Sequence, residues 1–119
     1  MILVVDDDDD LRELLASALE SRGFTVVQAS GGQAAIDALE GREHPCLMLL
    51  DLVMPGMNGW SVLEQMKARG IEDVPVCVMS ALPGRAPAGV AATLGKPFEL
   101  AELIALAERY CATANAAPD

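Results

Sequence analysis

Short apolar runs alternate along the chain with stretches that repeat apolar residues at helical spacing. The runs predict five strands, because each is bounded by turn signals and is too short for a helix. The predicted strands are Ile2–Val5, Thr25–Ala29, Cys46–Leu50, Val76–Met79 and a weak one near Ala91–Leu94. The predicted helices contain Leu11–Leu19, Gly32–Leu39, Val62–Met66 and Glu99–Cys111.

This alternation of strand and helix predicts an α/β fold with a parallel sheet and helices on both faces. The strand Cys46–Leu50 supports that prediction, since it is apolar at every position, as a strand buried on both faces should be. We expect one domain over residues 1–112 and a flexible tail over 113–119, which has no periodicity.

Polar side chains follow four of the five predicted strands. Asp6 and Asp7 come after the first strand, Asp51 after the third, Ser80 after the fourth and Lys96 after the fifth. Ligands of open α/β sheets bind outside the carboxyl ends of the strands. The pattern therefore predicts one site at that edge of the sheet, built from these side chains.

Three carboxylates at one edge would repel each other in a partly desolvated cleft. A divalent cation removes that conflict, and hard oxygen ligands suit Mg²⁺ best, with Mn²⁺ close behind. An aspartate can form an acyl phosphate, so Asp51 has two candidate roles, metal ligand and nucleophile. Lys96 could offset phosphoryl charge, and the Ser80 hydroxyl could donate to a phosphoryl oxygen. Asp6 and Asp7 could instead be solvated charges at a helix start.

Composition and charge narrow the function classes. The net charge of −10 argues against nucleic acid, whose phosphates need clustered Lys and Arg. No apolar run is long enough to span a membrane, and no secretory signal precedes the first strand. Cys46 and Cys77 lie in apolar segments and are expected to be buried and reduced, which favours the cytoplasm. The acidic turn after the first strand is unlike a glycine-rich nucleotide cradle.

Four motifs in order resemble the receiver domain of two-component response regulators, over nearly the whole chain. They are ILVVDDD (Ile2–Asp8), LLDLVMPGMNG (Leu49–Gly59), VMSA (Val78–Ala81) and KPF (Lys96–Phe98). The resemblance implies a flavodoxin-like, doubly wound five-stranded parallel sheet with strand order 2-1-3-4-5, an order for which the receiver CheY is an established example.

The resemblance also assigns roles to the predicted site. Asp6 and Asp7 match the acidic pair that holds Mg²⁺, Asp51 matches the phosphoacceptor, and the Val53 backbone carbonyl matches the third protein ligand. Ser80 matches the switch hydroxyl and Lys96 the phosphate-binding lysine. Such a domain assists its own phosphorylation and dephosphorylation without being an enzyme. Its donor would be a phosphohistidine on a histidine kinase or phosphotransfer protein, and its downstream protein partner is not indicated by the sequence.

Two departures from the family concern the usual output face. The segment from Ser80 to Lys96 is short and rich in Pro and Gly, so we expect the fourth helix to be short, irregular or absent. Thr93 stands where the family often has an aromatic residue. We therefore hypothesise that the signal leaves by an atypical surface, such as the Met54–Trp60 loop or the first and fifth helices.

Two alternatives compete with a phosphorylation switch or phosphorelay intermediate. One is a degenerate receiver that acts as a constitutive protein-interaction module, which the altered fourth-helix region favours. The other is an aspartate-nucleophile phosphatase, which needs a second Asp two residues after the nucleophile. Val53 occupies that position, so the phosphatase is disfavoured.

Overall fold

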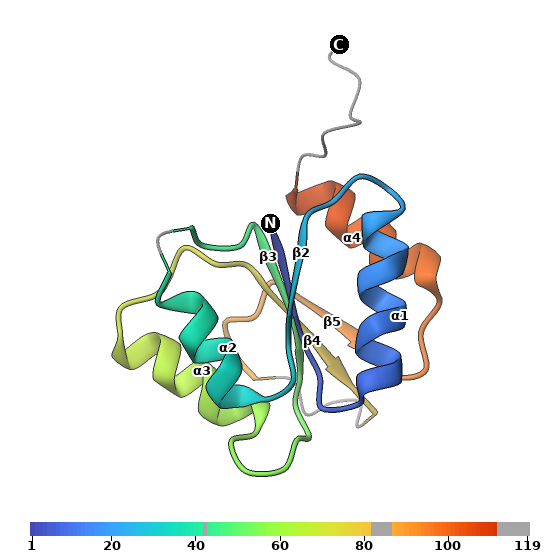
Figure 1. Ribbon diagram of the computed structural model, residues 1–119. Coiled ribbons are helices and arrows are strands. Elements are labelled where there is room, and N and C mark those ends of the chain that lie inside the picture. The colour runs from blue at the N-terminus through green and yellow to red at the C-terminus, as the bar shows by residue number, and fades with distance from the viewer. Residues whose placement is uncertain (42, 82–86, 112–119) are drawn as a thin grey trace.

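A computed structural model describes residues 1–41, 43–81 and 87–111 as a five-stranded parallel sheet flanked by helices (Figure 1). The strands are β1 (Ile2–Val5), β2 (Val26–Ala29), β3 (Leu47–Asp51), β4 (Val76–Ser80) and β5 (Ala92–Gly95). The helices are α1 (Asp9–Glu20), α2 (Gly32–Leu39), α3 (Gly59–Ala68) and α4 (Leu100–Tyr110). The strand order is β2-β1-β3-β4-β5, which confirms the predicted flavodoxin-like arrangement.

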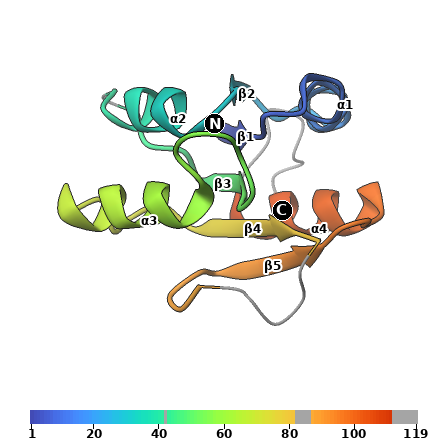
Figure 2. The ribbon, with the colours of Figure 1, turned by 90° about the horizontal axis from the view of Figure 1, so that it is seen from below.

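The sheet is the middle layer of three. Helices α2 and α3 cover one face, and α1 and α4 cover the other (Figure 2). Successive residues of β1 enter opposite layers: Leu3 and Val5 pack in the core beside α2 and α3, while Ile2 and Val4 pack beside α1 and α4. Because side chains of a strand alternate between faces, a strand covered on both sides must be apolar throughout. This explains the continuous apolar runs of the sequence.

The register of the sheet aligns the carboxyl ends of its inner strands. Val5 pairs with Leu50, Asp51 pairs with Met79, and Ser80 pairs with Gly95. The residues that end these strands or follow them therefore lie at one edge, where α1 and α3 also begin (Figure 1). The fold thus creates the edge that the sequence predicted.

Side-chain caps fix where two helices start beside that edge. The Asp8 carboxylate accepts from the Leu11 N–H at 3.1 Å, and Asn58 Oδ1 accepts from the Ser61 N–H at 2.9 Å. Each cap satisfies an amide that the first helical turn leaves without an intrahelical partner. Asp8 is therefore the N-cap of α1, and Asn58 is the N-cap of α3.

The expectation of a short, irregular or absent fourth helix is not borne out by the helix count. Four helices are present in the described ranges, and α4 is regular from Leu100 to Tyr110. The expectation concerned the connection from β4 to β5, of which residues 82–86 lie outside the described part. Residues 87–91, which are described, contain no helix. The prediction that the domain lacks a fourth helix is therefore not borne out, whereas the hypothesis of an atypical output surface, which also rested on Thr93, stays a prediction.

The cysteines correct a second expectation. Cys46 is not a reduced residue: it forms a disulfide with Cys111, across 65 residues of sequence. Cys46 directly precedes β3 and Cys111 caps the end of α4, and no local spacing signal indicates that these two positions meet. Cys77 is buried and free, as expected.

The remaining structural expectations concern membranes and the tail. None of the helices described here is both long and apolar enough to cross a bilayer. The expected tail, residues 113–119, lies outside the described residues.

Candidate acidic site at the carboxyl edge of the sheet

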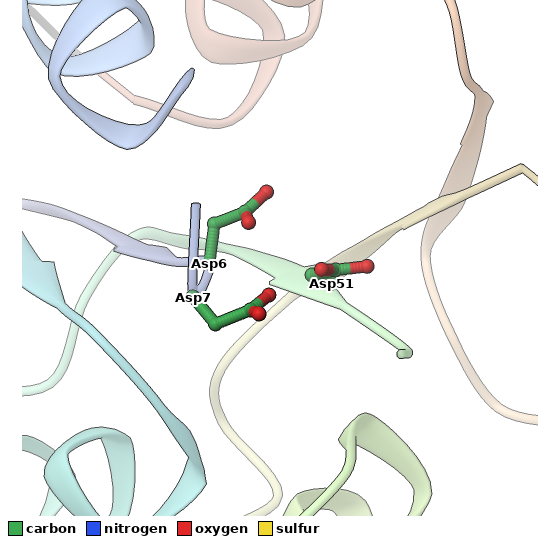
Figure 3. A group of neighbouring side chains, drawn as sticks. All are labelled: Asp6, Asp7 and Asp51. Atoms are coloured by element: carbon green, nitrogen blue, oxygen red, sulfur yellow. The ribbon is translucent and has the colours of Figure 1, made fainter. Parts of the chain in front are cut away.

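Three carboxylates meet at the carboxyl edge of the sheet (Figure 3). Asp6 and Asp7 follow β1, and Asp51 is the last residue of β3. One carboxylate oxygen from each lies within 4.8 Å of the others. Asp6 is fully buried and Asp51 is 6% exposed, whereas Asp7 is exposed. The site is therefore an acidic pocket in which two carboxylates are buried and the third, that of Asp7, is exposed.

Lys96 supplies the positive charge of this pocket. Its Nζ lies 3.2 Å from Asp6 Oδ2 and 3.6 Å from Asp51 Oδ1. The Lys96 backbone N–H donates to the Ser80 carbonyl at 2.7 Å, which anchors the residue at the ends of β4 and β5. The Lys96–Pro97 peptide bond is cis. The structure thus brings together four of the predicted residues, Asp6, Asp7, Asp51 and Lys96.

Asp51 is the carboxylate whose acidity the pocket changes most. The pKa of Asp51 is raised from 3.8 to about 6, chiefly because burial penalises the charged form and, to a smaller extent, because the Asp6 and Asp7 charges lie nearby. The Lys96 ammonium and the Val53 N–H, which donates to Asp51 Oδ1 at 3.3 Å, oppose that rise. The free pocket therefore holds more negative charge than it can solvate or pair well.

The other predicted site residues, Ser80 and Val53, also lie near the carboxyl edge of the sheet. Ser80 is buried at the end of β4, one strand away from Asp51. Val53 lies two residues beyond Asp51 with a side chain that is exposed, and its backbone is next to the Asp51 carboxylate through the N–H bond. Met57 and Trp60 are partly buried against the core. His44 is half-buried and forms a hydrogen bond with Asp73.

Arg12 is the residue of this region that sequence reasoning missed. It lies on α1, and its Nη1 donates to the Asp6 carbonyl at 2.9 Å. Its Nε donates to Gln28 Oε1 at 3.1 Å. The only local sequence signal was a single arginine two residues after five consecutive aspartates, and such an arginine is explained equally well by charge balance.

The donor set of the pocket fits a hard divalent cation. All three acidic side chains offer carboxylate oxygen, which Mg²⁺ prefers, and their oxygens are close enough to share one ion. Burial first, and the neighbouring Asp6 and Asp7 charges after it, raise the pKa of Asp51, so positive charge is only partly supplied by Lys96. The three aspartates therefore form an acidic triad of the kind that binds magnesium.

Residues 2–108 match the response regulator receiver domain family. The chain belongs to this family. Receiver domains are phosphoacceptors rather than true enzymes, and histidine kinases phosphorylate them. The receiver domain described here has the acidic pocket of Asp6, Asp7 and Asp51 with Lys96 beside it, consistent with a phosphorylation switch.

Relatives of known sequence and structure agree with this assignment. Response regulator MprA of Mycolicibacterium vanbaalenii is 36% identical over 110 residues, which are 87% of this chain and 47% of MprA. The receiver domain of NtrX from Brucella abortus is 32% identical, with a TM-score of 0.80 over 92% of this chain and 97% of that one. TrrA from Thermotoga maritima, solved in complex with Mg(2+)-BeF, is 26% identical, with a TM-score of 0.79 over 92% and 97%.

The receiver domain spans less than half the length of curated relatives such as MprA. The family of the domain is therefore shown, whereas the activity of any longer protein that contains it is a matter for proposal.

Proposed function

We propose that this receiver domain is a phosphorylation switch or phosphorelay intermediate in which Asp51 accepts a phosphoryl group from a phosphohistidine. The observation that carries the proposal is the position of the buried Asp51 carboxylate, 3.6 Å from Lys96 Nζ and within an acidic triad. The donor belongs to a histidine kinase or a histidine phosphotransfer protein, and an unidentified downstream protein reads the phosphorylated state. Neither nucleic acid nor a membrane has a role in this transfer.

The proposed transfer needs little proton chemistry. An Asp51 oxygen attacks phosphorus, the N–P bond of the phosphohistidine breaks, and its electron pair returns to the imidazole. Lys96 offsets the charge on the phosphoryl oxygens, and the Ser80 hydroxyl donates to one of them. The Lys96 backbone N–H donates to the Ser80 carbonyl, which holds the backbones of these two residues together at the strand ends. The product is an acyl phosphate on Asp51 and a free histidine.

We further propose that Asp6, Asp7, Asp51 and the Val53 backbone carbonyl hold Mg²⁺, with Mn²⁺ as a substitute. The TrrA complex with Mg(2+)-BeF supports this assignment, as does the all-oxygen donor set of the pocket. Bound Mg²⁺ would supply positive charge that stabilises the transferring phosphoryl group.

The domain boundary expected from the sequence, residues 1–112, and a cytoplasmic setting stay proposals. The Cys46–Cys111 disulfide counts against the cytoplasmic setting.

Acetyl phosphate tests the acceptor role, since it is a small acyl phosphate that needs no partner protein. Incubated with acetyl phosphate and Mg²⁺, the wild-type chain should gain the mass of one phosphoryl group, measured by intact-protein mass spectrometry. Asp51→Asn should gain none, while Asp10→Asn, which removes an exposed acid from α1, should behave as wild type. EDTA should suppress the gain by at least about tenfold, because the metal charge is lost.

The alternative is a degenerate receiver that binds partners without being phosphorylated. It predicts no mass gain in the wild type, or a gain that persists in Asp51→Asn. The buried carboxylate beside Lys96 speaks against this alternative, because an unused buried charge is costly to keep.

A further inference from the structure

The Arg12 guanidinium joins three parts of the chain beside the acidic pocket. Its Nη1 donates to the Asp6 carbonyl at 2.9 Å, its Nε to Gln28 Oε1 at 3.1 Å, and its Nη2 lies 2.7 Å from Asp9 Oδ1. The side chain is only 12% exposed, although it belongs to the first turns of a surface helix. A solvated arginine that merely balances nearby aspartates would not need this burial or this set of partners.

The contacts connect three separate elements beside the acidic pocket. Gln28 lies on the edge strand β2, Asp9 begins α1, and the Asp6 carbonyl belongs to the turn between β1 and α1. A guanidinium is planar, and its fixed donors point in several directions at once. Arg12 can therefore hold the turn at a set position relative to both β2 and α1.

The held carbonyl lies within the acidic pair itself. The Asp6 carbonyl carbon is bonded to the backbone nitrogen of Asp7, so fixing that carbonyl sets the peptide plane from which the Asp7 side chain departs. The Asp6 carboxylate is held separately, by the Asp8 N–H at 2.9 Å and by Lys96. Asp7 is exposed, and Arg12 supplies the side-chain contact made to the peptide that leads into it.

We propose that Arg12 is a positioning residue for this acidic pair, holding the Asp6–Asp7 peptide so that the pocket is preorganised for a divalent cation. The inference rests on the proposed function, because it assigns a support to the cation site of that function. Removal of a group that hydrogen-bonds to a metal ligand and orients it typically weakens metal binding by about 10–100-fold. Arg12 acts through backbone and one ligand, so we expect a smaller loss, about 3–10-fold.

If Arg12 acted only through its charge, its removal would have the opposite effect on the affinity for Mg²⁺. Arg12 is a cation beside an acidic pocket, so its removal makes the pocket more negative and should attract Mg²⁺ more strongly. For a screened charge outside the ligand shell this gain is at most about twofold. A weaker affinity after removal of a positive charge would therefore separate positioning from electrostatics.

The test is Mg²⁺ titration by isothermal calorimetry of three variants against the wild type. Arg12→Met removes every polar contact and keeps much of the alkyl stem. Arg22→Met is the matched control, since it removes the same charge from an exposed position beyond the end of α1. Arg12→Lys keeps the positive charge and loses the planar set of guanidinium N–H donors. Circular dichroism and thermal unfolding establish that each variant is folded at the titration temperature.

We expect Mg²⁺ to bind about 3–10-fold more weakly to Arg12→Met, about 2–5-fold more weakly to Arg12→Lys, and equally or up to twofold more tightly to Arg22→Met. If Arg12→Met does not fold, Arg12→Lys carries the test. Unchanged or tighter binding by the Arg12 variants, with normal wild-type binding, would overturn the role of Arg12 alone. Absence of Mg²⁺ binding to the wild type would instead overturn the proposed function, and this inference with it.

Discussion

At the scale of single residues, Asp51 combines the proposed acceptor role with a cost to the folded state. The carboxylate is nearly buried and lies beside two other acids, and Lys96 compensates it only in part. A carboxylate with these surroundings favours a ligand that brings positive charge. The same surroundings lower the stability of the folded state in favour of function.

This cost predicts a pH-dependent gain in stability for Asp51→Asn. Burial raises the pKa of Asp51 from 3.8 to about 6, so its ionisation destabilises the folded state, with no penalty below pH 3.8 and the full penalty above pH 6. In EDTA at pH 7.5 the variant should be about 1–3 kcal/mol more stable than the wild type. Near pH 4 the gain should almost vanish.

Urea unfolding at both pH values measures this effect. Asp10→Asn is the control, since Asp10 is exposed on α1 and should change the free energy of unfolding by no more than about 0.5 kcal/mol. A gain for Asp51→Asn of equal size at pH 4 and pH 7.5 would contradict the assignment, because then ionisation of the carboxyl would not be its cause.

At the scale of elements, the close packing of α2 against the loop between β3 and α3 keeps that loop near Asp51. A Cβ placed on Gly32, the first residue of α2, would lie 2.6 Å from the Met57 carbonyl oxygen and 2.7 Å from the Met57 Cβ. Met57 is partly buried against the same core as α2. Two segments far apart in the sequence therefore touch at a position that only glycine can occupy without displacement.

Two neighbouring substitutions test this contact. Gly32→Ser should destabilise the fold by about 1–3 kcal/mol, because its Cβ forces the backbone of the loop to move. Gly31→Ser adds the same atoms where a Cβ meets nothing within 4 Å, and Gly31 is the N-cap of α2, so it should stay within about 0.5 kcal/mol of the wild type. Thermal unfolding compares the pair, and equal effects would show that α2 does not hold the loop in this way.

The elements were largely predictable from the sequence because their signals are local. The apolar runs located all five strands to within a residue or two at each end, and Gly32–Leu39 was predicted with its observed bounds. The polar residues at the strand ends then located the site. Asp51 is the last residue of β3 rather than the first after it, a difference that leaves its place at the sheet edge unchanged.

The contacts that could not be predicted join distant positions by shape rather than by pattern. The donors of Arg12 reach β2, which depends on how α1 lies against the sheet. The approach of Gly32 to Met57 depends on the packing angle between α2 and the loop. The same holds for Cys46 and Cys111, where the prediction of a reduced Cys46 was wrong. The prediction of a short, irregular or absent fourth helix failed for another reason. The Pro and Gly residues between β4 and β5 disfavour a regular helix only within that connection.

At the scale of the whole molecule, the disulfide links the start of β3 to the end of α4 in the core layer that contains α1 and α4. Cys111 is buried in that layer, and Cys46 packs against it at the start of β3. The crosslink spans 65 residues, a loop for which the chain-entropy estimate of stabilisation is about 4 kcal/mol. The crosslink lies at the end of β3 remote from Asp51, so it should affect stability far more than phosphorylation.

Reduction of the disulfide should therefore lower the free energy of unfolding by about 2–4 kcal/mol. Urea unfolding with and without dithiothreitol measures the loss, and Cys111→Ser should be insensitive to the reductant and resemble the reduced wild type. Cys77→Ala keeps the crosslink and should respond to dithiothreitol as the wild type does. No change in the wild type on reduction would argue that the two thiols are not linked in solution.

The disulfide also divides the covalent structure of the molecule in a way that the sheet conceals. The disulfide closes residues 46–111 into a covalent ring, and residues 1–45 are an N-terminal segment attached to this ring at one point. The acidic pair belongs to the N-terminal segment, whereas Asp51, Ser80 and Lys96 belong to the ring. The pocket is therefore formed between the N-terminal segment and the ring, which are held together by the insertion of β1 beside β3. Any event that draws residues 1–45 away separates the acidic pair from Asp51 and leaves the covalent ring closed.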